Sequence, residues 1–301
     1  MVVRDEAHQL VECLAPVIDL FDQIAIVDTG SRDGTPQLLL DRFGIEVLYR
    51  DLDENRCGCL CDPRHDGLAL LSTPWVLLLD ADERLERSML EHIRALPDDP
   101  SMAGYFGRWL NRSAGESDFE DYKLFLFRNG LRPRGLVHDV VQLDIRSRGL
   151  HAGWLEGLDI LHLPDAGRRQ SKAERYRQRL QCAIDLQPDF YRYYWFLGYM
   201  EFRAGHWQRS AELLSRATGV CSAQFPVECL NSAMVLSELF ARQQDERALE
   251  RVLARACAFF DEASEDFEVR INFRLGPWLE AAWENLRHGR MDRIRAYRFA
   301  C

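Results

Sequence analysis

Positive charge, long apolar runs and paired cysteines are all scarce in this chain. Its formal net charge is −10 over 301 residues, and lysine occurs only at Lys123 and Lys172. Binding to a phosphate backbone needs a basic surface, so we expect no nucleic-acid partner. No stretch approaches the ~18 apolar residues of a membrane span, so we expect no transmembrane segment either.

The N-terminus lacks the features of an export signal. Charged residues begin at Arg4, and no apolar segment of the kind found in signal peptides follows. The nine cysteines are odd in number and scattered. These observations predict a reduced, cytoplasmic protein. The hydrophobic content of 47% is high enough for real cores, and the length suits two domains.

Three cysteines recur at every second position, at Cys57, Cys59 and Cys61, with His65 nearby. Cysteine and histidine together are typical zinc ligands, but structural zinc sites use C-x₂₋₄-C pairs, and no second pair follows. Free thiols on a loop or short strand are the favoured interpretation.

The stretch around which the chain is organised is W-V-L-L-L-D-A-D-E, residues 75–83. Its unbroken apolar run predicts a buried strand in a parallel or mixed α/β sheet. Asp80 and Asp82 follow at the carboxyl end, where such sheets bind ligands, and point to one side. Two carboxylates there suit Mg²⁺ or Mn²⁺. The alternative is a solvated strand end or the N-cap of the next helix.

Strand and helix patterns alternate through the first half of the chain. Strands are expected over 1–4, 24–27 and 45–49, separated by helical patterns, which indicates a parallel sheet with crossover helices. After the acidic stretch we expect a helix over 88–96 and strand-like runs over 105–110, 122–127, 140–145 and 158–163.

From Ser171 onward the patterns are helical. Tyr194–Gly198, a turn glycine at Gly205 and a small residue at Ser210 are close to the tetratricopeptide pattern, and Ala248 takes the place of Ser210 in a weaker second copy. We therefore predict a first domain over 1–165 and a helical-repeat domain over 171–301. A generic helical bundle is the alternative.

Three motifs in order carry a family resemblance: V-R-D-E at 3–6, I-V-D-T-G-S-R-D-G-T at 26–35, and an arginine ahead of the acidic stretch. In this order they resemble a family 2 glycosyltransferase with the GT-A fold over roughly residues 1 to 165. The helical region resembles the branch that includes lipopolysaccharide-core glucosyltransferases and the S-glycosyltransferases that modify bacteriocin peptides. The implied fold class is α/β, a Rossmann-like mixed, mostly parallel sheet, followed by an all-α tetratricopeptide-like domain.

The resemblance implies a metal site that holds the diphosphate of a nucleotide sugar. Asp82 would be the direct ligand of Mn²⁺ or Mg²⁺, and Asp80 would touch the ribose or reach the metal through water. His162 looks like the late histidine that many GT-A enzymes bring back to the metal. A histidine packed in the core is the alternative for His162.

The resemblance also implies donor contacts. Asp28 and Glu6 match positions near the nucleotide, usually uridine, and Arg64 matches an arginine that reaches the base or the phosphates. A turn-stabilising aspartate and a surface arginine are the alternatives. Two departures bear on this side of the site, because His65 stands where the family commonly has asparagine and the first strand is short.

An inverting transfer needs a general base, for which a carboxylate is the usual choice. Asp139, after His138, matches a His-Glu pair of this branch and is slightly preferred. Asp121, in the Glu120-Asp121 pair, is the other candidate. His138 would orient the acceptor or a phosphate.

These features predict a metal-dependent inverting glycosyltransferase that moves a hexose from a nucleotide sugar, with a UDP-sugar preferred. The acceptor would be a peptide, a protein or an oligosaccharide. The alternative is a catalytically weak nucleotide-sugar-binding module whose repeats recruit a peptide or protein. The oligomeric state stays open, with a homodimer through the helical domain as one expectation.

Overall fold

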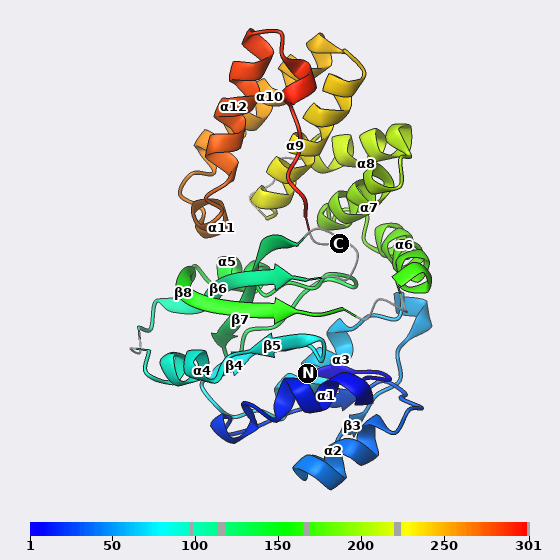
Figure 1. The fold of residues 1–301 in the computed structure, drawn as a ribbon, viewed down its shortest axis with the longest axis vertical. Coiled ribbons are helices and arrows are strands. Elements are labelled where there is room, and N and C mark those ends of the chain that lie inside the picture. Colours follow the sequence, from blue (N-terminus) through cyan, green and yellow to red (C-terminus); the bar gives the residue numbers. More distant parts are fainter. Residues whose placement is uncertain (97–98, 113–117, 165–168, 220–223, 300–301) are drawn as a thin grey trace. The chain divides into compact units, whose positions relative to one another are not determined.

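The computed structural model describes residues 1–96, 99–112, 118–164, 169–219 and 224–299, with the side chains of 169–172 left aside. The chain forms two compact units, Met1–Ala173 and Glu174–Cys301. The predicted end of the first domain, at residue 165, lies outside the described residues. Figure 1 shows the strands in the first unit and helical hairpins in the second.

A three-stranded parallel sheet opens the first unit, in the order β1 (Val2–Val3), β2 (Val27–Asp28) and β3 (Leu48–Tyr49). Helices α1 (Ala7–Leu14) and α2 (Thr35–Phe43) connect the strands, and the short 3₁₀ helix η1 (Ile18–Leu20) precedes β2. The alternation of strands and helices predicted from the sequence is confirmed here, with strands shorter than expected.

Local sequence explains the limits of α2. Pro36 stands in its first turn, where a missing N–H costs nothing, and Gly44 ends it in the left-handed conformation at φ 67°. The 3₁₀ helix η2 (Glu54–Arg56) and helix α3 (Cys61–Ala69) then lead to the acidic stretch.

A five-stranded mixed sheet holds the acidic stretch. Its order is β4-β7-β6-β8-β5, with β6 and β8 parallel and the other pairs antiparallel. The strands are β4 (Trp75–Leu77), β5 (Glu83–Leu85), β6 (Met102–Asn111), β7 (Phe119–Arg128) and β8 (His151–His162). Helix α4 (Arg87–Arg94) follows β5. The mixed sheet agrees with the expected fold class, although half of the six strand pairings in the described residues are antiparallel.

One strand prediction is wrong. The run over 140–145 forms helix α5 (Gln142–Ser147) instead, and Val140 makes only an isolated bridge to Arg134. Val141 and Ile145 are both buried and lie four positions apart, which is one face of a helical turn. The apolar spacing was therefore helical, despite its strand-like composition.

The core of the first unit ties both sheets to their helices. Leu10, Ile26 and Leu39 from the parallel sheet and its helices are buried in one cluster with Phe125 and Leu158 of the mixed sheet. Burying a side chain of this size stabilises the fold by roughly 1.5–3 kcal/mol. The cluster fixes the carboxyl ends of β2 and β4, from which the candidate site residues project.

The second unit is helical. Its elements are α6 (Arg169–Leu186), α7 (Arg192–Arg203), α8 (Trp207–Gly219), α9 (Pro226–Arg242), α10 (Glu246–Glu262), α11 (Phe267–Ile271), α12 (Leu275–Arg287) and the 3₁₀ helix η4 (Met291–Arg293). Helices α7 and α9 begin 34 positions apart, at residues 192 and 226, which is the tetratricopeptide period.

The hairpin of α7 and α8 has the close contact that its sequence predicts. Ser210 Oγ donates to the carbonyl of Gly198 at 2.8 Å, and a Cβ on Gly198 would lie 2.7 Å from the Leu214 side chain. Gly205 turns the chain at φ 81°. Ala248, the equivalent of Ser210 in the next hairpin, is also buried.

Candidate functional site

The acidic motif after β4 places its carboxylates in three different environments. The side chains of Asp80 and Asp82 are 32% and 24% exposed, whereas that of Glu83 is 1% exposed. Glu83 accepts hydrogen bonds from the indole Nε1–H of Trp109 and the backbone N–H of Asp80, both at 2.8 Å. Glu83 therefore fixes the turn, and the other two carboxylates are left to face solvent.

Two cations flank Asp80. Lys123 Nζ lies 3.3 Å from its Oδ2, and Arg64 Nη2 lies 3.6 Å from its Oδ1. Burial alone would raise the pKa of Asp80, but the charges of Lys123 and Arg64 outweigh it and hold that pKa well below its usual range. Asp80 is thus ionised and already paired before any ligand arrives.

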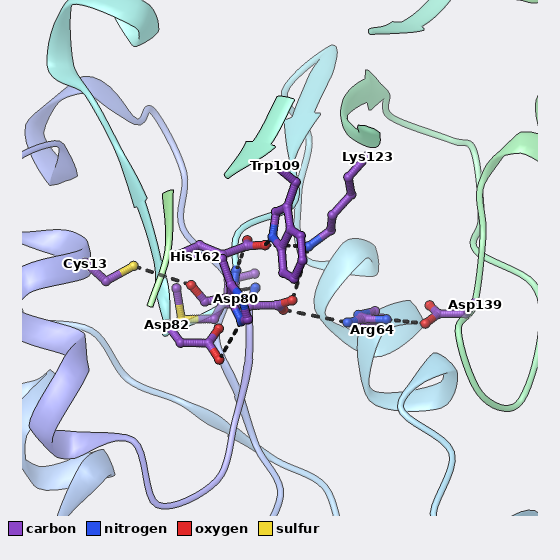
Figure 2. Close-up of polar contacts among 11 residues, drawn as sticks. Cys13, Arg64, Asp80, Asp82, Trp109, Lys123, Asp139 and His162 are labelled. Carbon is purple, nitrogen blue, oxygen red and sulfur yellow. Dashed lines mark hydrogen bonds and ion pairs between the residues drawn. The ribbon is translucent and has the colours of Figure 1, made fainter. Parts of the chain in front are cut away.

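Lys123 also forms an ion pair with Glu83, in which Nζ lies 2.7 Å from Glu83 Oε1. Burial lowers the pKa of the Lys123 ammonium, but Glu83 and Asp80 outweigh that effect, so the pKa is raised and the group stays charged. For Glu83, burial raises the carboxyl pKa against the opposing charge of Lys123. Figure 2 shows Lys123 reaching down beside Trp109 to the acidic motif.

Asp82 meets the predicted late histidine. His162 Nε2 lies 3.2 Å from Asp82 Oδ2, and His162 Nδ1 lies 2.6 Å from Asn111 Oδ1 (Figure 2 shows the first contact). Trp109 stacks on the imidazole, with ring centroids 4.1 Å apart. Strand register explains the meeting, since β5 pairs with β8 and Glu83 lies opposite His162.

The tautomer of His162 bears on cation binding. When Asn111 Oδ1 accepts the Nδ1 proton, the neutral ring turns the lone pair of Nε2 toward the Asp82 carboxylate. Two acceptors then face each other, an arrangement that a cation between them relieves. Among the described residues no cluster of three or more His, Cys, Asp or Glu side chains is arranged to hold a metal ion. A cation at this pair would take its remaining ligands from water or a bound phosphate.

Arg64 links the acidic motif to the first candidate base. It projects from α3, and its Nη1 is ion-paired with Asp139 Oδ1. The Asp139 side chain is 5% exposed, and its Oδ2 has no hydrogen-bond partner among the described residues. Burial alone would lower the pKa of the Arg64 guanidinium. The charges of Asp139 and Asp80 outweigh burial, so the pKa is raised. The neighbouring His138 adopts a left-handed backbone at φ 52°.

The second candidate base, Asp121, shares a sheet face with the motif's partners. Asp121 lies opposite Trp109 across β6 and β7, and it stands two positions before Lys123. Side chains directly opposite on neighbouring strands, and two apart on one strand, point to the same face. Glu120 therefore points to the other face, where it is exposed and near Arg108.

The donor-side candidates sit at the carboxyl ends of β1 and β2. Asp28 is 1% exposed, and its Oδ1 accepts from the N–H groups of Gly30 and Ser31, both at 2.9 Å. Asp28 Oδ2 is buried without a hydrogen-bond partner in the described part of the chain. Glu6 stands at the N-cap of α1, and its N–H donates to Thr35 Oγ1 at 3.0 Å, which ties the two strand ends together.

Cys57, Cys59 and Cys61 are buried free thiols, and Cys61 is the first residue of α3. Cys61 Sγ lies 3.2 Å from the carbonyl of Pro133, and His65 Nε2 lies 2.7 Å from the same carbonyl. His65 thus contacts the chain near the Asp139 loop. Another thiol, Cys13 of α1, lies 3.6 Å from the Asp80 carbonyl, and burial raises its pKa to about 12, so it stays protonated.

Sequence reasoning missed three residues of this site, Lys123, Trp109 and Asn111. All three reach the motif through strand pairing between β6, β7 and β8. Lys123 did carry a signal, since it is one of two lysines in an arginine-rich chain. An apolar cavity of about 350 Å³ lies beside β1 and β4. Of the candidate site residues named above, only Arg64 lines it.

Comparison with known proteins identifies the class that this fold and motif define. A mixed α/β unit with an acidic motif at the end of β4 is the arrangement of a GT-A glycosyltransferase domain. Glycosyl transferase family 2 matches residues 1–154, and the chain belongs to that family. In the described residues no helix is both long and apolar enough to cross a membrane.

A curated relative and several solved structures are similar to this chain. A TPR repeat-containing protein of Synechococcus elongatus is 32% identical over 142 residues, which cover 47% of this chain and 34% of that protein. The chain thus matches about a third of that relative's length.

Residues 1–349 of S. aureus TarS are 14% identical, with 99% of this chain and 92% of that chain covered at a TM-score of 0.37. The mannosyltransferase PcManGT from Pyrobaculum calidifontis, solved with GDP-Man and Mn²⁺, is 15% identical, with 96% and 81% covered at a TM-score of 0.44.

Proposed function

We propose that this chain is a metal-dependent inverting hexosyltransferase that uses a nucleotide sugar, preferably a UDP-sugar, and transfers to a peptide, protein or glycan. The observation that supports it most is the Asp82–His162 pair, in which a carboxylate and an imidazole nitrogen approach to 3.2 Å. In this proposal the pair is the place at which the charge of the donor diphosphate is neutralised.

The residues present fit Mn²⁺ or Mg²⁺. Asp82 and His162 would hold the ion, Asp80 would reach it through water, and Asn111 orients His162 from behind. When bound, the ion supplies positive charge that stabilises the departing diphosphate. This assignment retains the roles that the family resemblance implies.

Asp28 and Glu6 would bind the nucleoside end of the donor. The unpartnered Oδ2 of Asp28 is a buried acceptor, which a donor N–H or O–H of the nucleoside would satisfy. Gly30 and Ser31 hold the carboxylate in one orientation through the other oxygen. Arg64, beside Asp80, would contact the phosphates.

We assign the general base to Asp121. It would accept the proton of the acceptor nucleophile as that atom bonds to the anomeric carbon and the diphosphate leaves from the opposite face. Asp139 is less suited, although sequence reasoning preferred it, because it is buried and ion-paired with Arg64. Asp139 would instead hold Arg64 in place, with His138 beside it orienting the acceptor.

The helical unit would recruit the acceptor. Stacked helical hairpins offer extended surfaces to peptides, which supports a peptide or protein acceptor. The domain limits 1–165 and 171–301, the cytoplasmic location and a homodimer through the helices remain predictions.

A thermal-shift screen of UDP-sugars and GDP-sugars, each with and without Mn²⁺, tests the enzyme proposal. We expect stabilisation of several degrees by one UDP-sugar only when Mn²⁺ is present, because ligand binding to the native state raises its stability. Stabilisation by a nucleotide sugar without product formation would favour the binding-module alternative. No stabilisation by any of them would reject both.

A further inference from the structure

The ammonium group of Lys123 occupies the space between two carboxylates of the acidic motif. Its Nζ lies 2.7 Å from Glu83 Oε1 and 3.3 Å from Asp80 Oδ2, above the ring of Phe125 at 4.9 Å. The side chain is 31% exposed, so it borders solvent. A positive charge therefore already sits beside the motif that is proposed to receive a metal ion.

The two contacts of Lys123 differ in strength. Glu83 is buried and is held by Trp109 and the Asp80 N–H, so the short contact to Glu83 anchors the lysine. Asp80 is more exposed, and its contacts to Lys123 and Arg64 are longer, at 3.3 and 3.6 Å. Asp80 is thus the partner that can exchange its cation while Lys123 stays in place.

The charge balance decides when a divalent ion can enter. Like charges repel more strongly in a partly buried site than in water, so the cations beside Asp80 oppose an incoming metal ion. A diphosphate brings negative charge that offsets this repulsion and also attracts Lys123. The metal ion and the donor are therefore favoured together, and the metal ion alone is disfavoured.

We propose that Lys123 is a built-in counter-ion that keeps divalent metal from binding the acidic motif until a diphosphate donor arrives. The inference rests on the proposed function, because it assumes the Asp82–His162 metal position. It assigns Lys123 as a positioning residue that couples metal and donor binding.

The test is calorimetric titration of Mn²⁺ into donor-free protein. We expect weak binding in the wild type and at least tenfold tighter binding in Lys123→Met, because Asp80 and Glu83 lose their shared cation. Lys123→Arg keeps the charge and should match the wild type. Unchanged or weaker Mn²⁺ binding in folded Lys123→Met would overturn the inference.

Two further variants keep the result interpretable. Because Lys123→Met leaves Glu83 buried without its cation, Lys123→Gln decides if the methionine variant does not fold, since its neutral amide can still donate a hydrogen bond to Glu83. Lys123→Gln too should bind Mn²⁺ at least tenfold more tightly, and without that gain the inference fails. Arg108→Met is the matched control, because Arg108 pairs with Asp159 and extends from the opposite face of the sheet.

Titration of Mn²⁺ into protein that already contains UDP separates the inference from the proposed function. We expect UDP to raise the Mn²⁺ affinity of the wild type at least tenfold and that of Lys123→Met by much less. If UDP leaves wild-type Mn²⁺ binding unchanged but Lys123→Met still binds Mn²⁺ more tightly without donor, the counter-ion role stands and the donor assignment fails. If UDP strengthens Mn²⁺ binding equally in both proteins, the coupling assigned to Lys123 is refuted.

Discussion

Two clusters of acids and cations, one in each unit, put similar chemistry to different uses. In the helical unit, Glu201 is 8% exposed, and its two oxygens are taken by Arg177 Nε at 2.7 Å and His206 Nδ1 at 2.5 Å. At the acidic motif, Asp80 and Asp82 remain a quarter to a third exposed.

The difference lies in how completely each carboxylate is satisfied. Glu201 closes the turn between α7 and α8, also through its carbonyl, which accepts from the His206 N–H at 2.9 Å. Asp82 instead faces a histidine nitrogen that can itself be an acceptor. A saturated cluster stabilises the fold, and an incompletely satisfied one is ready for a ligand.

The largest effect is expected from Asp82→Asn. Removing the carboxylate charge should lower the turnover of nucleotide-sugar hydrolysis by about 10²–10³-fold, similar to the loss of one transition-state charge contact. The unfolding midpoint should stay close to that of the wild type, because the side chain is partly exposed. Steady-state hydrolysis assays and thermal melts measure the two quantities.

Glu201→Gln is the matched variant for Asp82→Asn in the other cluster. It should leave hydrolysis within about twofold of the wild type, because it lies outside the proposed site. Full activity in Asp82→Asn would show that the acidic motif does not serve catalysis.

The next effect concerns the base. Asp121→Asn should lower kcat of sugar transfer by about 10²–10⁴-fold, because the acceptor proton loses its carboxylate. Asp139→Asn should mainly raise the donor KM, because Arg64 loses its partner. A rate assay over pH distinguishes the two, since only Asp121→Asn should remove the acidic limb of the kcat profile. The opposite pattern would restore Asp139 as the base.

A smaller effect is expected from changing Asn111, the residue that orients His162. Asn111→Ala removes the group that orients His162 Nδ1 and should weaken Mn²⁺ binding in the presence of UDP by about 10–100-fold. Calorimetry at saturating UDP measures the affinity. Asn129→Ala serves as a control, because Asn129 follows β7 beside the start of β4, at the other end of that strand from the acidic motif. Unaltered Mn²⁺ affinity in Asn111→Ala would show that His162 is a packed residue.

The smallest effect is on stability. Burial would raise the pKa of Glu201, but hydrogen bonds from His206 and Arg177 outweigh it and hold the pKa below its usual value. Its stabilisation is therefore present above the unfolded-state pKa, near 4.5, and is lost as pH falls through the lower folded-state value.

Urea unfolding of Glu201→Gln tests that linkage. The variant should lose about 1–2 kcal/mol of unfolding free energy at pH 7 and progressively less below about pH 4.5. A loss that is constant with pH would indicate packing rather than charge.

The sequence predicted those features of the fold that depend on residues close together in the chain. The end of the apolar run located Asp80 and Asp82, and Gly205 located the turn between α7 and α8. Helix α5 was misread because Val141 and Ile145 sit in a run of branched side chains that also suits a strand.

The partners of the motif depend on contacts that no local window contains. Asp82 and His162 are 80 positions apart, and Lys123 and Asp80 are 43 apart. The family resemblance anticipated His162, but Lys123 and Asn111 became visible only through the register of β6, β7 and β8. The charge compensation of Asp80 could not be read from its motif for the same reason.

The most direct test of the central claim is an anomalous-scattering map of crystals grown with Mn²⁺ and UDP. The account predicts a manganese peak at Asp82 Oδ2 and His162 Nε2, the two atoms that would hold the ion beside the diphosphate. A manganese ion bound elsewhere, with the 3.2 Å contact between Asp82 and His162 intact, would contradict it.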